Sequence, residues 1–456
     1  MAPAVAAFDI GKTNLKLVVT DGAGRRLASR TAPNAPQPPT TARPWSALDV
    51  AGAWRFVVEG LRELAAPHGV GAIVFSTHGA AGALVDDDGE VAAPLDYEFD
   101  GFGDDGYAAL RPPFAQTLSP ALPRGLNLGR QIHFVERSDP AAFARATAFL
   151  AYPQYWAWRL GGRRASEVTS LGCHTDLWNP VAGRFSTLVE ARGWTRLFPP
   201  LARAWDRLGP LDPGIAADTG LDPATAILCG AHDSNAALLP RLRASEAPFT
   251  LVSTGTWVIV MAVGGAVGAL DPGADMLANV DALGRPTPSA RFMGGREFAA
   301  IAGGSPAEID AGDLASAIEA GAMALPAFSD QGGPFAGRAG RIVGPPPRDA
   351  RALTAVATLY CALTTAHLVE RLAAPGEIVV EGGFARTEAF ASALAGFLPG
   401  RVVSRSAEAN AAEGVAELAR WGEPPARRPV ERASPPPTVA IAAYRAKWEA
   451  LARAGA

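Results

Sequence analysis

Apolar and polar positions near the N-terminus alternate in a way that is typical of short strands joined by turns. Val5–Asp9 and Leu15–Thr20 are mostly apolar, and the polar segment Gly11–Asn14 lies between them. A second polar segment, Asp21–Gly24, leads into a third candidate strand at Arg25–Arg30. The pattern predicts a hairpin followed by a third strand, and not a βαβ unit.

The following segments predict a loop, a helix and a buried strand. Thr31–Pro44 is too rich in proline for a helix or a strand and is expected to form an exposed loop. Apolar residues at helical spacing predict a helix over Leu48–Leu64, and Ala72–Ser76 has the pattern of a buried strand. Tyr97–Leu150 has weaker periodicity and many Gly, Pro and Asp residues, so we expect it to elaborate the sheet and shape a substrate cleft.

The second half of the chain begins with a pattern like that of the N-terminus. Thr250–Met261 is an apolar strand, a polar turn containing Gly255 and another apolar strand, as Ala6–Val19 is around Gly11. A repeat half a chain apart indicates two homologous α/β domains facing a shared cleft, here residues 1–244 and 245–456. Further helices are expected at Ala236–Leu242, Arg351–Leu372, Thr387–Leu398, Glu408–Trp421 and Val439–Arg453, and strands at Ala226–Cys229, Pro248–Ser253, Glu377–Glu381 and Arg401–Ser404.

Composition and charge exclude several classes of protein. The 456 residues carry 41 Lys+Arg and 45 Asp+Glu, a net charge of −4, which excludes an electrostatically driven nucleic-acid binder. Cys173, Cys229 and Cys361 lie far apart, so neither a zinc ribbon nor a disulfide framework is implied, and a reducing cytosol fits. No stretch approaches the roughly 20 uncharged apolar residues of a membrane span. We therefore expect a cytoplasmic protein with no membrane partner.

Two glycine-containing turns are candidate phosphate sites. Backbone amides around Gly11, with Lys12 and Thr13, can point together at phosphate oxygens. Asp9, at the end of the preceding strand, has the kind of carboxylate that a hydrated Mg²⁺ ion requires. The second copy, Ser253–Thr256, would hold the same triphosphate from the other side. An ordinary hairpin turn is the alternative for the first copy, and no Walker loop or G-x-G-x-x-G motif is present.

Asp233 is the candidate catalytic base. It follows a buried strand, and phosphoryl transfer to a hydroxyl needs one group that accepts the proton late in the reaction. A simple helix N-cap is the alternative for Asp233. The neighbouring His232 is either a core histidine or a residue that supports Asp233, and the structural role is expected. His78 ends a strand before Gly79, where a small ligand can approach closely, and is either a substrate contact or a structural histidine.

Two other segments have both a functional and a plain interpretation. The acidic cluster that includes Asp96 could bind sugar hydroxyls or could simply be solvated. Gly382 and Gly383 lie between a strand and a helix, where they would let adenine lie against the backbone or would form an ordinary tight turn. Lysine is rare in this chain, yet Lys12 and Lys16 both fall in the first phosphate segment, where a compact ammonium suits a crowded site better than a guanidinium.

Taken in order, these motifs resemble those of the FGGY family of carbohydrate kinases, within the actin-like ATPase superfamily. The resemblance runs from Phe8 to about Arg420. It is carried by Asp9–Lys16, Ser76–Gly79, Tyr152–Gly162, Gly230–Asp233, Ser253–Thr256, Phe292–Glu297 and Glu381–Gly383. It implies a ribonuclease-H-like core in each half, closure of the cleft between them, and ATP- and Mg²⁺-dependent phosphorylation of a ketose or polyol.

The resemblance also implies roles for single residues. Asp233 would be the catalytic base and would contact the substrate together with His78 and Asp96, and Asp9 would bind Mg²⁺. The nucleotide would be bound by Gly11, Lys12, Thr13, Asn14, Lys16, Gly255, Thr256, Gly382 and Gly383. The chain departs from the family pattern at Lys12, where Thr or Ser is common, at Glu388, where Asn is frequent, and around Pro94–Glu98, where the usual Trp-x-Asp is missing.

The substrate is expected to be a small sugar. The segment Phe292–Glu297 and the short chain favour a deoxyketose such as L-rhamnulose or L-fuculose, with xylulose or a polyol as the alternative. A chaperone-like or regulatory ATPase of the same superfamily is the rival from another class, although no separate peptide-binding region follows the second domain. A homodimer is left open.

Overall fold

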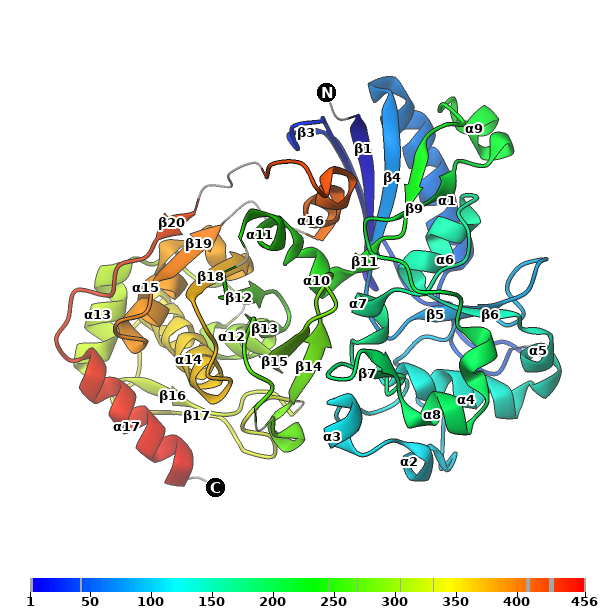
Figure 1. Ribbon diagram of the computed structural model, residues 1–456. Coiled ribbons are helices and arrows are strands. Elements are labelled where there is room, and N and C mark those ends of the chain that lie inside the picture. Colours follow the sequence, from blue (N-terminus) through cyan, green and yellow to red (C-terminus); the bar gives the residue numbers. More distant parts are fainter. Residues whose placement is uncertain are drawn as a thin grey trace. The chain divides into compact units, whose positions relative to one another are not determined.

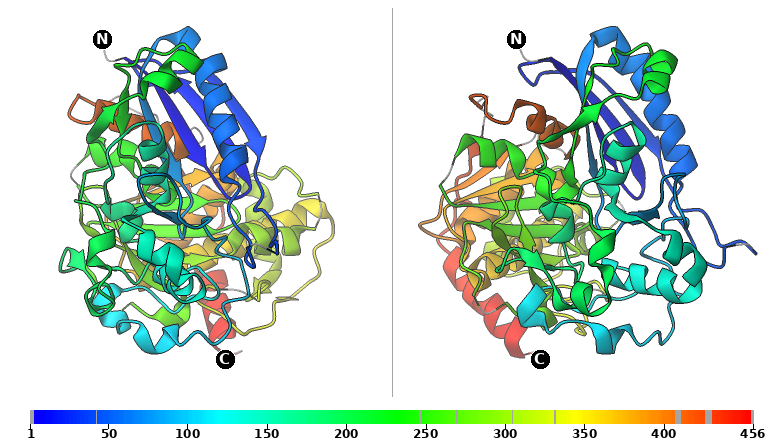
Figure 2. Two further views of the ribbon diagram at one scale, coloured as in Figure 1. Left: turned by 90° about the vertical axis from the view of Figure 1, so that its right-hand side faces the viewer. Right: turned by 45° about the vertical axis from the view of Figure 1, so that its right-hand side comes forward.

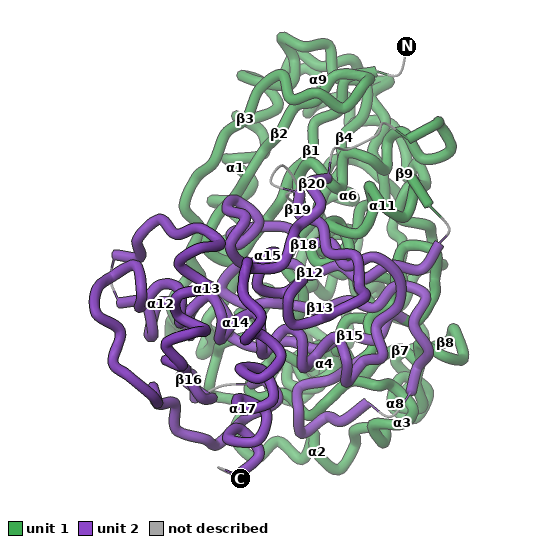
Figure 3. The backbone as a smooth tube through the Cα atoms, turned by 90° about the vertical axis from the view of Figure 1, so that its left-hand side faces the viewer, with its two compact units in different colours: residues 1–245, 278–286, 410–427 green, residues 246–277, 287–409, 428–456 purple. Residues whose placement is uncertain are grey.

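The structure is a computed structural model that describes residues 3–41, 43–245, 247–268, 270–303, 305–330, 332–406, 411–425 and 430–454. The chain forms two compact units, which Figure 3 distinguishes by colour. Unit 1 comprises Met1–Ser245, Ala278–Pro286 and Asn410–Arg427, and unit 2 comprises Glu246–Leu277, Thr287–Ala409 and Arg428–Ala456. The predicted division at residues 244 and 245 lies beside the first crossing between units, and two short later segments count with unit 1.

Unit 1 is built on a mixed sheet with the strand order β3-β2-β1-β4-β10-β9, in which β11 also pairs with β4. β1 pairs in antiparallel fashion with β2 and in parallel with β4, and these strands stand at the centre of the blue sheet in Figure 1. The strands are β1 (Ala4–Ile10), β2 (Asn14–Thr20), β3 (Arg26–Pro33), β4 (Val70–Thr77), β9 (Arg207–Pro210), β10 (Ala226–Leu228) and β11 (Ala231–His232). The predicted hairpin and third strand are confirmed.

The third strand is longer than expected. Thr31–Pro33, assigned to a loop because of its proline, continues β3, with Pro33 opposite Asn14 in the register. β3 is the edge strand of the sheet, and a proline at the end of an edge strand removes no ladder hydrogen bond that the sheet needs. The prediction of a loop was therefore wrong for these three residues.

Helices cover both faces of this sheet. α1 (Val50–Gly60), continued by a π-helical turn to Ala65, buries Phe56 against Phe8 of β1 and runs along one face (Figure 2). α6 (Tyr152–Arg159) adds Trp156, which stacks on Phe75 of β4. α16 (Ala411–Ala416) packs against β1, β2 and β4 on the other face (Figure 1). Because β1 is covered on both sides, its residues form the continuous apolar run seen in the sequence.

The segment expected to elaborate the sheet, Tyr97–Leu150, belongs to a second, mostly helical core in unit 1 that also includes residues before and after it. Leu84, Phe102, Ile132 and Trp178 are among its buried residues. Its elements are β5 (Gly82–Val85), α2 (Tyr107–Leu110), α3 (Phe114–Thr117), α4 (Leu128–Ser138), α5 (Pro140–Arg145), β6 (Ala148–Ala151), α7 (Val168–Leu171), β7 (Trp178–Asn179), β8 (Arg184–Phe185) and α8 (Thr187–Ala191). Unit 1 also contains α9 (Pro213–Thr219), α10 (Asp233–Ala236) and α11 (Leu239–Ala244).

Unit 2 repeats the central arrangement of unit 1. β12 pairs in antiparallel fashion with β13 and in parallel with β18, in a sheet of order β14-β15-β13-β12-β18-β19-β20. The strands are β12 (Phe249–Thr254), β13 (Val258–Val263), β14 (Met276–Val280), β15 (Pro286–Phe292), β18 (Glu377–Gly382), β19 (Val403–Ser406) and β20 (Glu431–Arg432), with β16 (Met323–Leu325) and β17 (Arg341–Val343) forming a separate pair. The predicted repeat is confirmed at the level of strand order.

The helices of unit 2 agree with most of the sequence prediction. They are α12 (Gly294–Ala302), α13 (Ala311–Ala320), α14 (Ala350–Arg371), α15 (Glu388–Phe397) and α17 (Ile441–Ala454), of which α12 and α13 were not foreseen. The helix expected at Glu408–Trp421 corresponds to α16 and a 3₁₀ turn at Glu417–Arg420, both counted with unit 1, and its first residues lie outside the described ones.

Helix α14 bears on the expectation that no stretch of the chain resembles a membrane span. By length and composition it is the one helix among the described residues that could cross a membrane, with a mean hydropathy of 1.5 in its most apolar window. However, 83% of that window is buried inside the protein. Buried residues lie all around α14, among them Val356, Tyr360 and Leu363, as is typical of a core helix that is apolar on every side.

Candidate active site

The turn between β1 and β2 is closed by glycine and held by an asparagine. The Gly11 amide donates to the Asn14 carbonyl oxygen at 3.0 Å, which leaves a Cβ at Gly11 only 2.8 Å from that oxygen. Asn34 Nδ2 donates to the Gly11 carbonyl at 2.7 Å, and the Asn34 amide donates to the Thr13 carbonyl at 2.8 Å. Asn14 Nδ2 donates to the Thr13 hydroxyl at 3.1 Å, so the predicted turn residues form one hydrogen-bonded unit. Asn34 was missed in the sequence.

Asp9 lies in β1 between Lys16 of β2 and Ser76 of β4. Ser76 Oγ donates to Asp9 Oδ1 at 3.1 Å. Burial, followed by the negative charge of Asp233, raises the pKa of Asp9 to about 7, against the opposing effects of Ser76, Lys16 and His232. The charge of Asp233 therefore acts on Asp9, and a nearby cation would favour the ionised form of Asp9.

Asp233 is the first residue of the short helix α10, directly after β11. The N-cap of α10 is His232 and not Asp233, so the N-cap interpretation of Asp233 was wrong. Asp233 Oδ1 accepts from the Ser234 amide at 2.6 Å and lies 3.3 Å from His232 Nε2. The Asp233 side chain is 33% exposed, so the carboxylate is held through one oxygen while solvent reaches the group.

His78 follows β4 and is buried. Its Nδ1 lies 2.9 Å from the Gly79 carbonyl oxygen, and its ring packs against Tyr97 and Tyr152 at 5.6 and 5.7 Å between ring centroids. Burial lowers the pKa of His78, which keeps the ring neutral at neutral pH. Because a carbonyl oxygen only accepts, Nδ1 carries the proton and Nε2 is left as an acceptor, which suits a ligand hydroxyl. The charges of Asp233 and Lys12 act on the same ring.

Lys12 and Asp96 meet, although the sequence assigned them to different ligands. The Lys12 ammonium is bound by the Asp96 carboxylate, lies 2.9 Å from Glu98 Oε2 and sits 4.1 Å above the centre of the Tyr97 ring. Asp96 is buried and also accepts from Ser46 Oγ at 3.1 Å. Lys12 therefore ties the turn to the segment in which sugar contacts were expected, and its role in phosphate binding stays a prediction.

The corresponding turn of unit 2 is also closed by a glycine amide, but it is one residue shorter, running from Gly255 to Trp257 instead of from Gly11 to Asn14. The Gly255 amide donates to the Trp257 carbonyl at 2.9 Å. The Gly295 amide, from the first turn of α12, donates to the Thr256 carbonyl at 3.2 Å, and Gly295 lies too close to Gly255 for any side chain. The Arg291 guanidinium covers the Trp257 ring at 4.8 Å. Backbone contacts thus fix the position of Gly255 and Thr256.

Thr254 connects this turn to the predicted adenosine segment. Its hydroxyl donates to the Glu381 carbonyl at 2.5 Å and accepts from the Phe384 amide at 2.9 Å. Gly382 has a φ of +87°, and a Cβ there would collide with the Thr254 carbonyl oxygen. Gly383 is exposed, and a Cβ there would lie 3.7 Å from the same oxygen, an ordinary van der Waals distance. Within unit 2, the structure thus brings Gly255 close to Gly382. Within unit 1, it brings together five predicted site residues: Asp9, Lys12, His78, Asp96 and Asp233.

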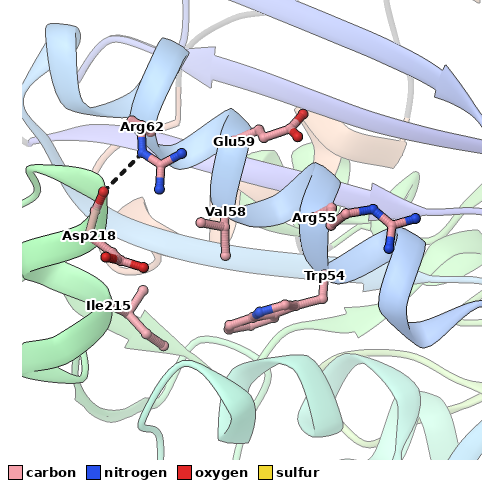
Figure 4. Close-up of a pocket in the computed structure, with 7 residues that line it drawn as sticks. All are labelled: Trp54, Arg55, Val58, Glu59, Arg62, Ile215 and Asp218. Carbon is pink, nitrogen blue, oxygen red and sulfur yellow. Dashed lines mark hydrogen bonds between the residues drawn. The ribbon is translucent and has the colours of Figure 1, made fainter.

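A surface hollow of unit 1 lies apart from these residues. It has a volume of about 250 Å³ and lies between α1 and α9 (Figure 4). Trp54 and Ile215 form its apolar walls, and Arg62 Nε donates to the Asp218 carbonyl at 2.9 Å. None of the predicted site residues lines this hollow, so the candidate chemistry rests on the strand ends and not on this hollow.

Comparisons with known proteins point to one family. Residues 246–427 match the model of the carbohydrate kinase FGGY C-terminal domain. A solved carbohydrate kinase from Novosphingobium aromaticivorans is 36% identical, with 99% of each chain covered and a TM-score of 0.89. A xylulose kinase from Rhodospirillum rubrum is 18% identical, with 99% of this chain and 98% of that chain covered and a TM-score of 0.79, and this likeness concerns the fold alone.

A curated relative adds a more distant likeness. L-fuculokinase from Escherichia coli (strain K12) is 24% identical over 266 residues, and the chain spans only 56% of its length. The predicted fold class is confirmed by the solved structures: an α/β protein with two ribonuclease-H-like domains of the actin-like ATPase type.

Proposed function

The chain belongs to the FGGY family of carbohydrate kinases, and on that premise we propose that it transfers the terminal phosphoryl group of ATP to a hydroxyl of a ketose. Members of this family are phosphotransferases with an alcohol group as acceptor, which leaves no place for the alternative of a chaperone-like ATPase. We propose a deoxyketose such as L-fuculose or L-rhamnulose as the sugar, a choice supported by the likeness to L-fuculokinase. A cytoplasmic location remains a prediction.

Asp233 is the proposed base. The observation that carries this role is its position beside Asp9 and His78 with one carboxylate oxygen held and the side chain one-third exposed. Oδ1 is occupied by the Ser234 amide and by His232, so Oδ2 is the oxygen that would accept the proton of the attacking hydroxyl. Phosphoryl transfer requires little from the protein besides positioning and charge neutralisation, so one carboxylate is enough to accept the hydroxyl proton.

His78 and Asp96 are proposed to contact the sugar. His78 Nε2 can accept a hydrogen bond from a sugar hydroxyl, because Nδ1 is engaged with the Gly79 carbonyl. Asp96 is held by Lys12 and Ser46, and its segment includes Tyr97, whose ring packs against His78. A polar contact and an apolar ring side by side suit a deoxy sugar, which has both hydroxyls and a methyl group.

Asp9 is the residue that would hold Mg²⁺. Mg²⁺ is usually held through one or two carboxylates, with waters and substrate phosphates as the other ligands, and a single half-buried carboxylate near a strand end fits this pattern. Among the described residues there is no cluster of three or more His, Cys, Asp or Glu side chains that could hold a metal by themselves. When bound, the ion would neutralise phosphate charge.

Two turns are proposed to bind the nucleotide. In unit 1 these are the residues Gly11–Asn14 with Lys16 nearby, and in unit 2 they are Gly255 and Thr256. Gly382 and Gly383 are proposed to seat the adenine, because neither has a side chain that would cover the backbone.

A panel of sugars tests the proposed function. Release of ADP is measured by a coupled assay with MgATP and L-fuculose, L-rhamnulose, D-xylulose, D-ribulose or glycerol. We expect ADP release to depend on sugar, with kcat/KM for a deoxyketose at least about tenfold above that for D-xylulose, because a methyl-sized difference in a pocket is worth about 10- to 200-fold. If D-xylulose has the highest kcat/KM of the panel, the proposed choice of sugar is wrong. ADP release that no sugar stimulates would overturn the kinase itself.

A further inference from the structure

Two buried ionisable side chains beside Asp233 have no role in the reaction as described so far. The Cys173 Sγ atom lies 3.4 Å from His232 Nε2, and the same nitrogen lies 3.3 Å from Asp233 Oδ1. Cys173 is 3% exposed and His232 is 5% exposed. One ring nitrogen of His232 therefore faces a thiol on one side and the proposed catalytic carboxylate on the other.

The contacts at Nε2 decide how the His232 ring lies. Nδ1 of His232 has no hydrogen-bond partner among the residues that the structure describes. A Cβ on Gly79 would lie 2.6 Å from Nε2 and 3.6 Å from the Cys173 sulfur, so only glycine admits the ring and the thiol at this point. Gly79 directly follows His78, which places the Cys173–His232 pair next to the proposed sugar contact.

A short helix positions both members of the pair. The Thr169 hydroxyl of α7 accepts from the His232 amide at 3.0 Å, and Cys173 follows α7 by two residues. Glu167 caps α7 and is fully buried, and it accepts from the Thr169 and Ser170 amides at 2.9 and 3.2 Å. The same capped helix therefore sets the distance between the sulfur and the ring.

The backbone after Cys173 is strained. His174 has a φ of +42°, a conformation that residues other than glycine rarely adopt. It is held there because its Nδ1 lies 2.8 Å from the Leu126 carbonyl and its own carbonyl accepts from Asn127 Nδ2 at 3.0 Å. Strain of this kind persists where the surroundings fix the conformation, and it is common at functional sites.

Charge favours a proton on the shared nitrogen. Burial alone would raise the pKa of Cys173, but His174 and His232 outweigh burial and lower it to about 5. Burial alone would lower the pKa of His232, but Cys173 and Asp233 outweigh burial and raise it to about 9. The other ionisable groups that act on the His232 ring are Glu167, Asp9 and His78.

From this geometry we propose that His232, anchored by Cys173, is a positioning residue for Asp233. The Nε2–H group of His232 lies between the sulfur and Asp233 Oδ1 and holds that oxygen in place, so that Oδ2 is presented to the substrate hydroxyl. This inference rests on the proposed role of Asp233 as the base. It replaces the expectation that His232 is merely structural.

Three variants test the pair. His232→Gln keeps a polar side chain but carries no charge, and we expect kcat to fall by about tenfold to a hundredfold with the sugar KM within about threefold of wild type. Cys173→Ser removes the anionic partner of His232, so we expect the decline of kcat at high pH to begin at a lower pH than in wild type. Cys229→Ser is the matched control, because Cys229 is equally buried in unit 1 but contacts Gln154.

The outcomes separate this inference from the proposed function. Asp233→Asn is assayed in parallel, with binding of ATP measured to show that each variant is folded. If Asp233→Asn is inactive while Cys173→Ser and His232→Gln keep the wild-type kcat and pH profile, the positioning role is wrong and the base stands. If Asp233→Asn is active, Asp233 is not the base, and the positioning role of His232 that depends on it is wrong as well. A pH profile that moves in Cys229→Ser as much as in Cys173→Ser would also overturn the inference.

Discussion

The hairpins of the two units share their strand pairing but differ in the length and the chemistry of their turns. In each unit the first strand of the hairpin also pairs in parallel with a later strand, β4 in unit 1 and β18 in unit 2. In each turn a glycine amide closes the loop, at Gly11 in unit 1 and at Gly255 in unit 2. The repeat that the sequence predicted is thus a repeat of strand arrangement, with the turn closed from Gly11 to Asn14 in unit 1 and from Gly255 to Trp257 in unit 2.

The side chains of the two turns differ in charge. Around Gly11, the residues Asp9, Lys12 and Lys16 are ionisable, whereas Ser253–Thr256 has hydroxyls and no charge. In unit 2 the buried Thr254 hydroxyl is used to join the turn to the end of β18. The comparison shows that the ionisable side chains beside the turn lie in unit 1, which also contains Asp233, whereas the turn of unit 2 carries hydroxyls.

The largest expected effect comes from removing the charge in the turn of unit 1. In Asp9→Asn the carboxylate proposed for Mg²⁺ is lost, and we expect kcat for sugar phosphorylation to fall by about a hundredfold or more, because neutralisation of phosphate charge carries much of this reaction. Steady-state assays at several Mg²⁺ concentrations measure the loss. A kcat within about tenfold of wild type at all of them would contradict the role of Asp9.

Asp9→Asn is also expected to change the stability of the protein. The pKa of Asp9 is raised to about 7, so the folded state binds this proton more tightly than the unfolded state, and the associated stability is lost as the pH rises through about 7. Without nucleotide or Mg²⁺, Asp9→Asn is therefore expected to melt at a higher temperature than wild type at pH 8, with a gain of about 1 kcal/mol that shrinks towards pH 4. A lower melting temperature at pH 8 would contradict the burial of an ionised carboxylate.

The next effect concerns the neutral turn of unit 2. Gly382→Ala forces a Cβ onto the Thr254 carbonyl at a φ of +87°, and we expect the KM for ATP to rise by about tenfold or the variant to lose about 1–3 kcal/mol of stability. Gly400→Ala is the matched control, because Gly400 also lies in unit 2 and has a similar φ of +81°, but no atom lies within 4 Å of a Cβ there. Equal kinetics and equal melting temperatures for the two variants would show that the close contact between Gly382 and Thr254 contributes neither to ATP binding nor to stability.

The smallest effect concerns Lys12 and sharpens the comparison within unit 1. Its ammonium lies on Asp96, Glu98 and Tyr97, so we expect Lys12→Arg to raise the sugar KM by about three- to tenfold, because the larger guanidinium does not fit the same contacts. Arg25→Lys, an exposed change, is the control and should leave both KM values unaltered. A rise confined to the ATP KM would instead support the phosphate role that the sequence indicated.

Periodicity predicted those elements that bury a continuous apolar surface. The strands β1, β2 and β12 and the helices α1 and α14 begin and end within a few residues of the expected positions, since their apolar residues are uninterrupted. β15 was missed because its buried positions include Thr287 and Ser289, which carry no apolar signal.

The site was predictable only where it coincides with a local motif. Asp9, Gly11, Asp233 and Gly255 stand at strand ends next to turns, and the sequence displays this directly. The contact of Lys12 with Asp96 and the contact of Cys173 with His232 join residues 84 and 59 positions apart. No local sequence pattern indicates such pairs, because the sheet and the capped helix α7 bring these residues together only in the folded chain.

The central claim is that unit 1 supplies the proton acceptor through Asp233. The most direct measurement is sugar-dependent ADP release by purified Asp233→Asn, together with the Kd for ATP from calorimetry. The account predicts that the variant binds ATP within about twofold of wild type but releases ADP about a thousandfold more slowly, in the range of rate that a general base contributes. ATP binding that is intact together with a rate within about tenfold of wild type would contradict it.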